Sequence, residues 1–408
     1  MADNRTIERR GDIRVRGSSG RTRSRRVARP VVAAAVALGI VLMPLARPVR
    51  ADAPPYRPGP RVPEIMGATP KAQAETLRAI ERGLRYLART QRNNGSWFNQ
   101  GGYGTYPAVM SSLAGLAFMA GGSTPETGPY ARNVTKAMIY ILRVSEAHKD
   151  GLIAGPGAEG RSMYGHGFSM LFLAHCYGME IGREYETRIH KALDKAVALT
   201  ARSQSDLGAH LKHAGGWIYT PTSRGDEGSV TVTQLQALRA CRNAGIKVPK
   251  KTIDRAVAYL KHCQMGDGGI CYSARSRSSS RPAISAAAIA CFYAAGIYDR
   301  RAGGVEGTES KMVARLVDYV KKRVQVGSGS SGMWGHYFYT HLYLAEAFYS
   351  RGGKDWKDYY PKIRNRLLGM QNPTDGSWNG DGVGTTYGTA IATIILQLPY
   401  GYLPIVER

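Results

Sequence analysis

Two kinds of helical segment alternate along most of the chain. In segments of the first kind, apolar residues recur at helical spacing on one face and charged residues occupy the other, which is typical of an amphipathic helix. Residues 77–87 are an example, in which one face carries Leu77, Ile80, Leu84 and Leu87. In segments of the second kind, such as residues 283–295, apolar side chains surround the helix on all sides. A helix of that kind has to be buried, so we expect the first helices outside and the second helices inside.

Each amphipathic segment is followed by a Gly-rich loop, an apolar segment and a Gly stop, and this unit repeats. The six predicted pairs are residues 77–87 with 107–121, 133–149 with 168–177, 186–204 with 230–243, 250–262 with 283–295, 310–324 with 337–349, and 356–370 with 387–398. They predict an all-α fold, an α/α toroid of six helical hairpins with an inner and an outer ring of helices. No strand-like alternation competes with this interpretation.

Residues 1–51 predict an export signal. An Arg-rich start is followed by an apolar stretch at residues 31–46 and by small residues at Val49 and Ala51. This order is typical of a secretory signal that is cleaved, here near Ala51. Cleavage would leave a Pro-rich linker at residues 52–70 and a toroid domain at residues 71–408, in the periplasm or outside the cell. An uncleaved membrane anchor is the alternative.

Basic residues outnumber acidic ones, 56 to 30, and the formal net charge is +26. This excess favours anionic neighbours such as headgroups at a membrane surface, acidic polysaccharide or a diphosphate, although a solvated basic surface explains it as well. We expect a small apolar or anionic ligand as partner and no nucleic acid. The chain lacks the phosphate-loop, His-Glu-x-x-His and Gly-x-Ser-x-Gly motifs, which argues against the enzyme classes that use them.

Five cysteines occur in the chain. Cys263 and Cys271 flank one loop and are placed to pair, whereas Cys176, Cys241 and Cys291 lie near helix ends, where buried thiols are the simpler interpretation. The sequence leaves the disulfide state open.

The long loops within the hairpins meet at one end of the predicted ring. They aim the N-termini of the inner helices at the mouth, where backbone N–H groups favour anions, so a cavity there is the expected ligand site. The predicted ligand-binding aromatic residues and histidine are Trp217, Tyr219, Tyr272, Trp334, His336 and Tyr339. The Ser/Arg loop at residues 273–281 adds Arg275, Arg277 and Arg281 as an anion site, with a solvated loop as the alternative.

A short motif recurs at the ends of first helices. Residues 91–97 read Gln-x-x-x-Gly-x-Trp, residues 371–378 repeat this with one residue inserted, and residues 264–270 keep the Gln and Gly but end in Ile. The motif resembles the repeat of squalene and oxidosqualene cyclases. Residues 70–400 look like the terpene cyclase/protein prenyltransferase superfamily, with prenyltransferase/squalene oxidase repeats. The resemblance implies an α/α toroid in which the Gln supports a helix end and the Trp packs beside it.

The candidate catalytic residues are Asp226 and Glu227. They lie where the resemblance places the Asp-x-Asp-Asp motif of class II terpene cyclases, which protonates an alkene, but Ser229 replaces the protonating aspartate. Two neighbouring carboxyl groups can raise the pKa of one of them for general-acid work. The alternative is that both residues cap the helix that begins near Val230.

A zinc site is a further candidate cofactor site. Asp267, Cys271 and His341 are zinc ligand types and resemble the ligands of protein prenyltransferases, although both spacings depart from that pattern. The alternative is a Gly turn, a Cys that pairs with Cys263 and a His that is hydrogen-bonded within a helix.

These features favour an exported protein that binds or transforms an apolar, isoprenoid-type ligand, as a terpene cyclase or prenyltransferase does. A carbohydrate-processing α/α barrel and a scaffold without chemistry are the alternatives, because the fold alone does not choose among them. The first predicts an apolar, aromatic-lined cavity. The second predicts an open groove with two carboxylates about 5–10 Å apart. The third predicts a ring plugged by side chains.

Overall fold

The computed structural model describes residues 69–99, 101–155, 159–205, 215–296, 308–327 and 336–403. These residues form helices and isolated β-bridges and no strand. The helices are α1 Pro70–Thr90, α2 Pro107–Ala120, α3 Ala131–Glu146, α4 Ser162–Cys176, α5 Arg183–Ser203, α6 Gly228–Asn243, α7 Lys250–His262, α8 Pro282–Ala294, α9 Thr308–Arg323, α10 Tyr337–Arg351, α11 Gly353–Met370, α12 Thr385–Gln397 and the short 3-10 helix η3 Leu398–Tyr400.

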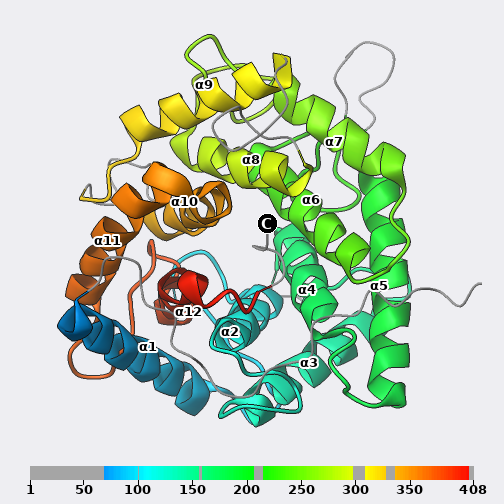
Figure 1. Cartoon of the computed structure of the whole chain (residues 1–408). Coiled ribbons are helices and arrows are strands. Elements are labelled where there is room, and N and C mark those ends of the chain that lie inside the picture. Colours follow the sequence, from blue (N-terminus) through cyan, green and yellow to red (C-terminus); the bar gives the residue numbers. More distant parts are fainter. Residues whose placement is uncertain are drawn as a thin grey trace, which may run out of the picture. The chain divides into compact units, whose positions relative to one another are not determined.

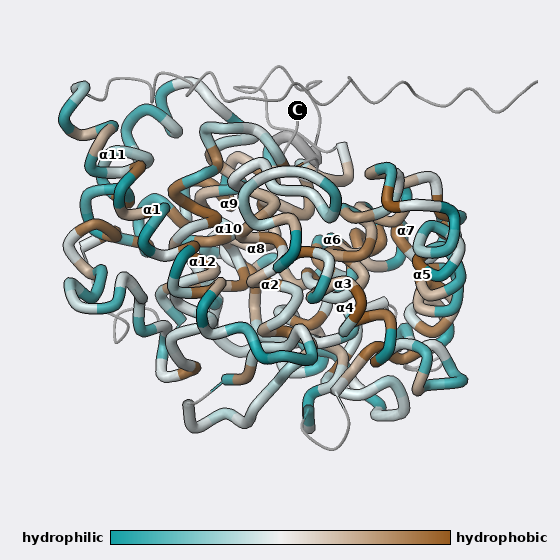
Figure 2. Tube along the Cα trace, turned by 90° about the horizontal axis from the view of Figure 1, so that it is seen from below, coloured by the Kyte–Doolittle hydropathy of each residue, from teal (hydrophilic) through white to brown (hydrophobic). Residues whose placement is uncertain are grey.

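The helices of the unit that spans Pro60–Arg408 form two concentric rings (Figure 1). The odd-numbered helices lie outside and the even-numbered helices lie inside, which confirms the predicted α/α toroid of six hairpins. Burial explains the arrangement: residues 282–293 of α8 are all buried, whereas only five of the thirteen residues of α7 are. Figure 2 shows the same contrast, because hydrophobic stretches gather inside the ring and hydrophilic ones along its outer helices and loops.

The Gln/Trp motif connects four of the outer helices, α1, α5, α7 and α11, to the next outer helix around the ring. The Gln91 side-chain amide donates to the carbonyls of Gly95 and Asn133, each at 3.0 Å, and the Trp97 indole donates to the Leu87 carbonyl at 2.9 Å. The same bonds recur around the ring at Gln204 with Trp217, at Gln264, and at Gln371 with Trp378. The motif is therefore structural, and its Trp donates to a carbonyl in the last turn of the outer helix that would otherwise lack a backbone partner.

A glycine is required within each copy of this motif. Gly95 has φ +92°, and a Cβ at this position would overlap the backbone carbonyl of Lys136 in the next outer helix. Gly215, Gly268 and Gly376 lie in the same way against Arg255, Arg315 and Arg82. Only glycine combines a left-handed backbone with such a close approach.

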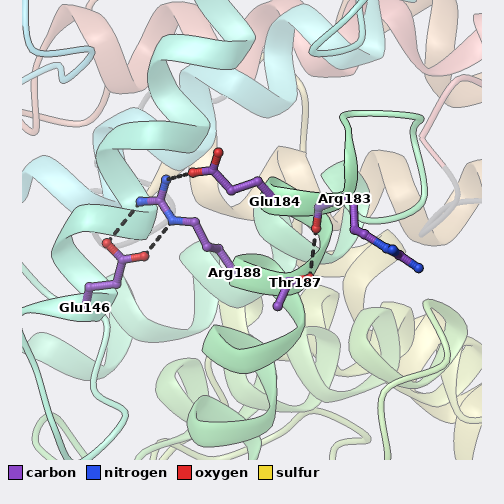
Figure 3. A network of polar contacts seen from close by, with 5 residues as sticks. All are labelled: Glu146, Arg183, Glu184, Thr187 and Arg188. Atoms are coloured by element: carbon purple, nitrogen blue, oxygen red, sulfur yellow. Dashed lines mark hydrogen bonds and ion pairs between the residues drawn. The ribbon is translucent and has the colours of Figure 1, made fainter.

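Polar contacts complete the outer ring. The first and last hairpins meet where Arg82 donates to the backbone carbonyls of Asn372 at 3.1 Å and Pro373 at 2.6 Å. Between α3 and α5, Arg188 forms a two-point ion pair with Glu146, at 2.7 and 3.0 Å (Figure 3). Exposed pairs of this kind add at most about 1 kcal/mol, so burial of the inner helices dominates stability.

The predicted export signal and most of the predicted linker lie outside the described residues. Within the described ranges, no helix has a stretch that is both long enough and apolar enough to cross a membrane.

Candidate functional site

A cavity of about 440 Å³ opens among the N-terminal ends of the inner helices. All six inner helices or the loops before them contribute to its wall, as the closed ring requires. Most lining side chains are aromatic or aliphatic: Tyr103, Tyr106, Val109, Met110, Tyr164, Phe168, Tyr272, Pro282, Ala283, Ile284, Tyr339, Leu342, Val383, Tyr387 and Ile391. Its polar lining residues are Arg161, Glu227, Ser229, Arg281 and His336. The predicted site end and its aromatic wall are thus present.

Glu227 places a carboxyl group in this wall and also caps α6. Its side chain accepts hydrogen bonds from the backbone N–H groups of Ser229 at 3.1 Å and Val230 at 2.8 Å. The Ser229 hydroxyl donates to it at 2.7 Å, and the Tyr164 hydroxyl lies against both residues. Burial raises the pKa of Glu227, although these donors oppose the shift. The group is therefore a buried helix cap.

Asp226 points away from the cavity. Its Oδ1 accepts from the Tyr259 hydroxyl of the outer helix α7 at 2.8 Å and from the Ala274 backbone N–H at 2.6 Å. The backbone at Glu227 is extended, with φ −153° and ψ 131°, and successive side chains of an extended segment project to opposite sides. The predicted carboxylate pair is therefore not formed, because only Glu227 faces the cavity.

Two other carboxylates hold N-termini of inner helices near the mouth. Glu159 accepts from the Ala108 N–H at the start of α2, at 2.7 Å, and Asp381 accepts from the first backbone N–H groups of α10, at 2.8 Å. Burial raises the pKa of Glu159 to about 7 and that of Asp381 to about 6. The predicted site omitted both residues, since neither adjoins in sequence the helix that it caps.

Two arginines lie at the rim of the cavity. The Arg161 guanidinium lies 4.4 Å from the ring centroid of Tyr219, and that of Arg281 lies 5.9 Å from the centroid of Tyr272. The two tyrosine hydroxyls are hydrogen-bonded to each other. Tyr219 therefore supports the rim from behind, while Arg161, Arg281 and Tyr272 line the cavity.

Arg161 was absent from the predicted ligand site. The available signal was its position directly before the inner helix α4, which matches the position of Arg281 before α8.

The structure corrects several predicted ligand residues. Trp217 is 1% exposed and belongs to the repeat motif, where its indole donates to the Thr200 carbonyl, so it is structural. Arg277 donates to the backbone carbonyls of His262 and Gln264 beside the outer helix α7, and Arg275 is exposed on the loop. Neither arginine lines the cavity. His336 and Tyr339 do line it, and Trp334 lies outside the described residues.

The predicted zinc ligands do not come together. Asp267 accepts from the Gly269 N–H and the Ser280 hydroxyl within its own loop, and Cys271 lies beside Cys263. His341 is buried in α10, where its Nδ1 shares a hydrogen bond of 2.9 Å with the Tyr359 hydroxyl. No group of three His, Cys, Asp or Glu side chains in the described part of the chain is arranged to hold a metal ion. This expectation is therefore corrected, because each side chain has local partners.

A larger hollow, about 1120 Å³, lies between α9, α10 and α11. Its charged wall includes Asp355, which forms ion pairs with Lys321 and Arg351. These charges are satisfied within the protein, and the hollow adjoins none of the inner-helix N-termini. The central cavity is therefore the better candidate site.

Solved α/α-toroid structures are similar to most of this chain. A variant of the type II terpene cyclase MstE from Scytonema, bound to geranylgeranyl dihydroxybenzoate, matches with TM-score 0.53 and 13% identity over 82% of this chain and 99% of that one. An inactive variant of the α-1,6-mannanase GH76A from Salegentibacter, bound to α-1,6-mannotriose, matches with TM-score 0.57 and 9% identity over 80% and 99%.

These matches establish the α/α-toroid fold. Because the sequence identities are low, the matches do not show which ligand this chain binds or which reaction it catalyses. No protein-family profile matches the sequence, and no curated protein matches it either.

Proposed function

We propose that the protein binds a small apolar ligand of isoprenoid type in the central cavity. The observation that carries this proposal is the cavity itself, about 440 Å³ and walled mainly by aromatic and aliphatic side chains. Its volume lies within the roughly 300–1,000 Å³ of small-molecule sites. Transfer of apolar ligand surface into such a wall is favourable by about 25 cal/mol per Å².

The aromatic rings give this wall its selectivity. Tyr164, Tyr272 and Tyr339 contribute aromatic rings, while Val109 and Ile391 add branched aliphatic surface. A flexible, branched hydrocarbon chain can pack against such a mixed wall. The fold of MstE, which is bound to a geranylgeranyl compound in its solved structure, is compatible with this ligand class.

Carbohydrate processing is the second candidate, and the likeness of fold supports it equally. Hydrolysis of a glycosidic bond commonly needs two carboxyl groups that face the substrate. Among the described residues that line the cavity, Glu227 is the only acidic one. Asp226, which would supply the second, is bonded to Tyr259 on the outer side. The apolar ligand is therefore the proposal that the cavity favours.

Chemical transformation of the ligand at Glu227 is a separate hypothesis. Its carboxyl group accepts from Ser229 and Val230, so the cap already occupies both oxygens. Ligand binding does not require these hydrogen bonds to break, whereas proton transfer from Glu227 would. We therefore limit the proposal to binding.

Native mass spectrometry tests this proposal. The protein is incubated with a lipid extract, and the bound species are compared with those on Ala283→Trp, in which the larger side chain fills the cavity from the start of α8. Arg275→Trp is the matched control, because it adds the same side chain on an exposed loop. We expect an apolar ligand on the wild type and on Arg275→Trp but not on Ala283→Trp. Equal ligand on all three proteins, or none on any, would overturn the proposal.

A further inference from the structure

Arg161 and Arg281 both line the central cavity near its mouth. Each is positioned over a tyrosine ring, and the two tyrosines, Tyr219 and Tyr272, are linked through their hydroxyl groups. A guanidinium over an aromatic face is attracted by the ring, and this restricts where it lies. The linked rings therefore connect the positions of two positive charges in the cavity wall.

The ends of the inner helices reinforce this charge. The N-terminal backbone N–H groups of α2, α6 and α10 donate hydrogen bonds to the carboxylates of Glu159, Glu227 and Asp381, respectively. By contrast, Arg161 and Arg281 occupy the N-cap positions of α4 and α8, and neither side chain forms a capping hydrogen bond. The partial positive charge of these two helix ends adds to that of the guanidinium groups. Glu159, Glu227 and Asp381 thus cap helices other than α4 and α8.

We propose that the ligand of the central cavity carries an anionic group, a carboxylate or a phosphate, that binds between Arg161 and Arg281. The apolar part of the ligand would extend inward along Phe168 and Ile391, which line the same cavity. Guanidinium groups suit such anions because they offer paired N–H donors in one plane. The inference rests on the proposed function, since it assigns the polar end of the same ligand.

Glu227 is the acidic side chain that faces this position within the described wall. An ionised carboxylate there would repel the anion. Burial raises the pKa of Glu227, and the α6 backbone N–H groups that donate to its carboxyl group offset part of its negative charge. Glu227 is therefore compatible with an anionic ligand.

A matched set of ligands tests the inference. Farnesol, farnesoic acid and farnesyl phosphate share one apolar chain and differ in their headgroup. Calorimetric titration of all three therefore separates the contribution of the apolar chain to the affinity from that of the charged headgroup. We expect one or both anions to bind the wild type roughly ten- to hundredfold more tightly than farnesol, as for hydrogen bonds to charged groups. The preferred anion identifies the headgroup, and added salt should weaken its binding more than that of farnesol.

The variants are Arg161→Gln and Arg281→Gln, with Arg275→Gln as control. Arg161 and Arg275 are exposed, so their replacement should leave the fold intact, which melting temperature checks. We expect each rim variant to lose most of the preference for the anion while its Kd for farnesol is unchanged, and Arg275→Gln to behave as wild type.

The outcomes separate this inference from the proposed function. Equal affinity of the wild type for all three ligands would overturn the anionic headgroup and leave the apolar cavity standing. Anion preference that survives in both rim variants would also overturn it. Absence of binding for every ligand would instead count against the proposed function and with it this inference.

Discussion

The hydroxyl of Tyr259 donates a hydrogen bond of 2.8 Å to the carboxylate of Asp226. This bond connects the outer helix α7 to the loop before α6 and turns Asp226 out of the cavity. Its sequence neighbour Glu227 consequently stands alone as the carboxyl group of the described wall. Asp226 thus connects the outer ring of helices to the inner one, while Glu227 caps α6.

Replacement of Asp226 should therefore affect stability and spare the ligand. Asp226→Ala removes the acceptor for the Tyr259 hydroxyl and the Ala274 N–H, and we expect a loss of about 1–3 kcal/mol in the free energy of unfolding, measured by urea titration. Asp226→Asn is the control, because its Oδ1 can accept both bonds. Loss of ligand affinity in Asp226→Ala without loss of stability would contradict this assignment.

Gly95 tests the role of the repeat motif. Gly95→Ala would place a Cβ against the Lys136 carbonyl at φ +92°, so we expect a loss of about 3 kcal/mol or failure to fold. Gly102→Ala is the control, since a Cβ there has no atom within 4 Å. Thermal unfolding of both variants checks the prediction, and equal melting temperatures would show that the close approach does not matter.

A buried acid should make stability fall as the pH rises. Glu346 lies inside the ring, where burial raises its pKa to about 7, and its Oε1 accepts from the Gln236 amide at 2.8 Å. The unfolded chain releases this proton near the ordinary pKa of about 4.3. The stabilisation by Glu346 is thus fully present below that value and is lost as the pH rises toward 7.

Urea titration at several pH values measures this loss. We expect wild type to lose at least about 1 kcal/mol between pH 4.5 and 7 through this group. Glu346→Gln stays neutral and should flatten the profile. The same slope in both proteins would assign the pH dependence to other groups.

Cys263 and Cys271 should form a disulfide under oxidising conditions. The Cys271 N–H donates to the Cys263 carbonyl at 2.9 Å, and the two sulfur atoms share a hydrogen bond that lowers the pKa of Cys271 to about 7. Exchange with oxidised glutathione would join the two sulfurs and release two reduced glutathione molecules. Loop closure of this length stabilises by about 2–3 kcal/mol.

Mass spectrometry and melting temperature check the disulfide. We expect the oxidised protein to lose two hydrogens and to melt higher, and a reductant to reverse both changes. Cys263→Ser is the control. Oxidised wild type that melts no higher than this variant would contradict the prediction.

The sequence predicted the architecture because the pattern that determines burial is local. Residues 250–262 and 283–295 differ in their periodicity, and this difference places α7 outside and α8 inside. The motif copy at Gln204 and Trp217 went unrecognised because residues 205–214 separate its two halves, and Trp217 was therefore predicted as a ligand residue.

The site was predicted less completely because it depends on side-chain direction and on contacts distant in sequence. The alternation of an extended segment would have separated Asp226 from Glu227. No local pattern shows that Glu159 caps α2, which begins 52 residues earlier at Pro107.

Calorimetric titration of farnesol at two temperatures tests the central claim most directly. If the central cavity binds an apolar ligand, the wild type should show saturable binding with a negative heat-capacity change, which marks burial of apolar surface. Ala283→Trp should abolish this binding at an unchanged melting temperature, and Arg275→Trp should preserve it. Binding that is equally strong in Ala283→Trp, or no saturable binding to wild type, would contradict the account.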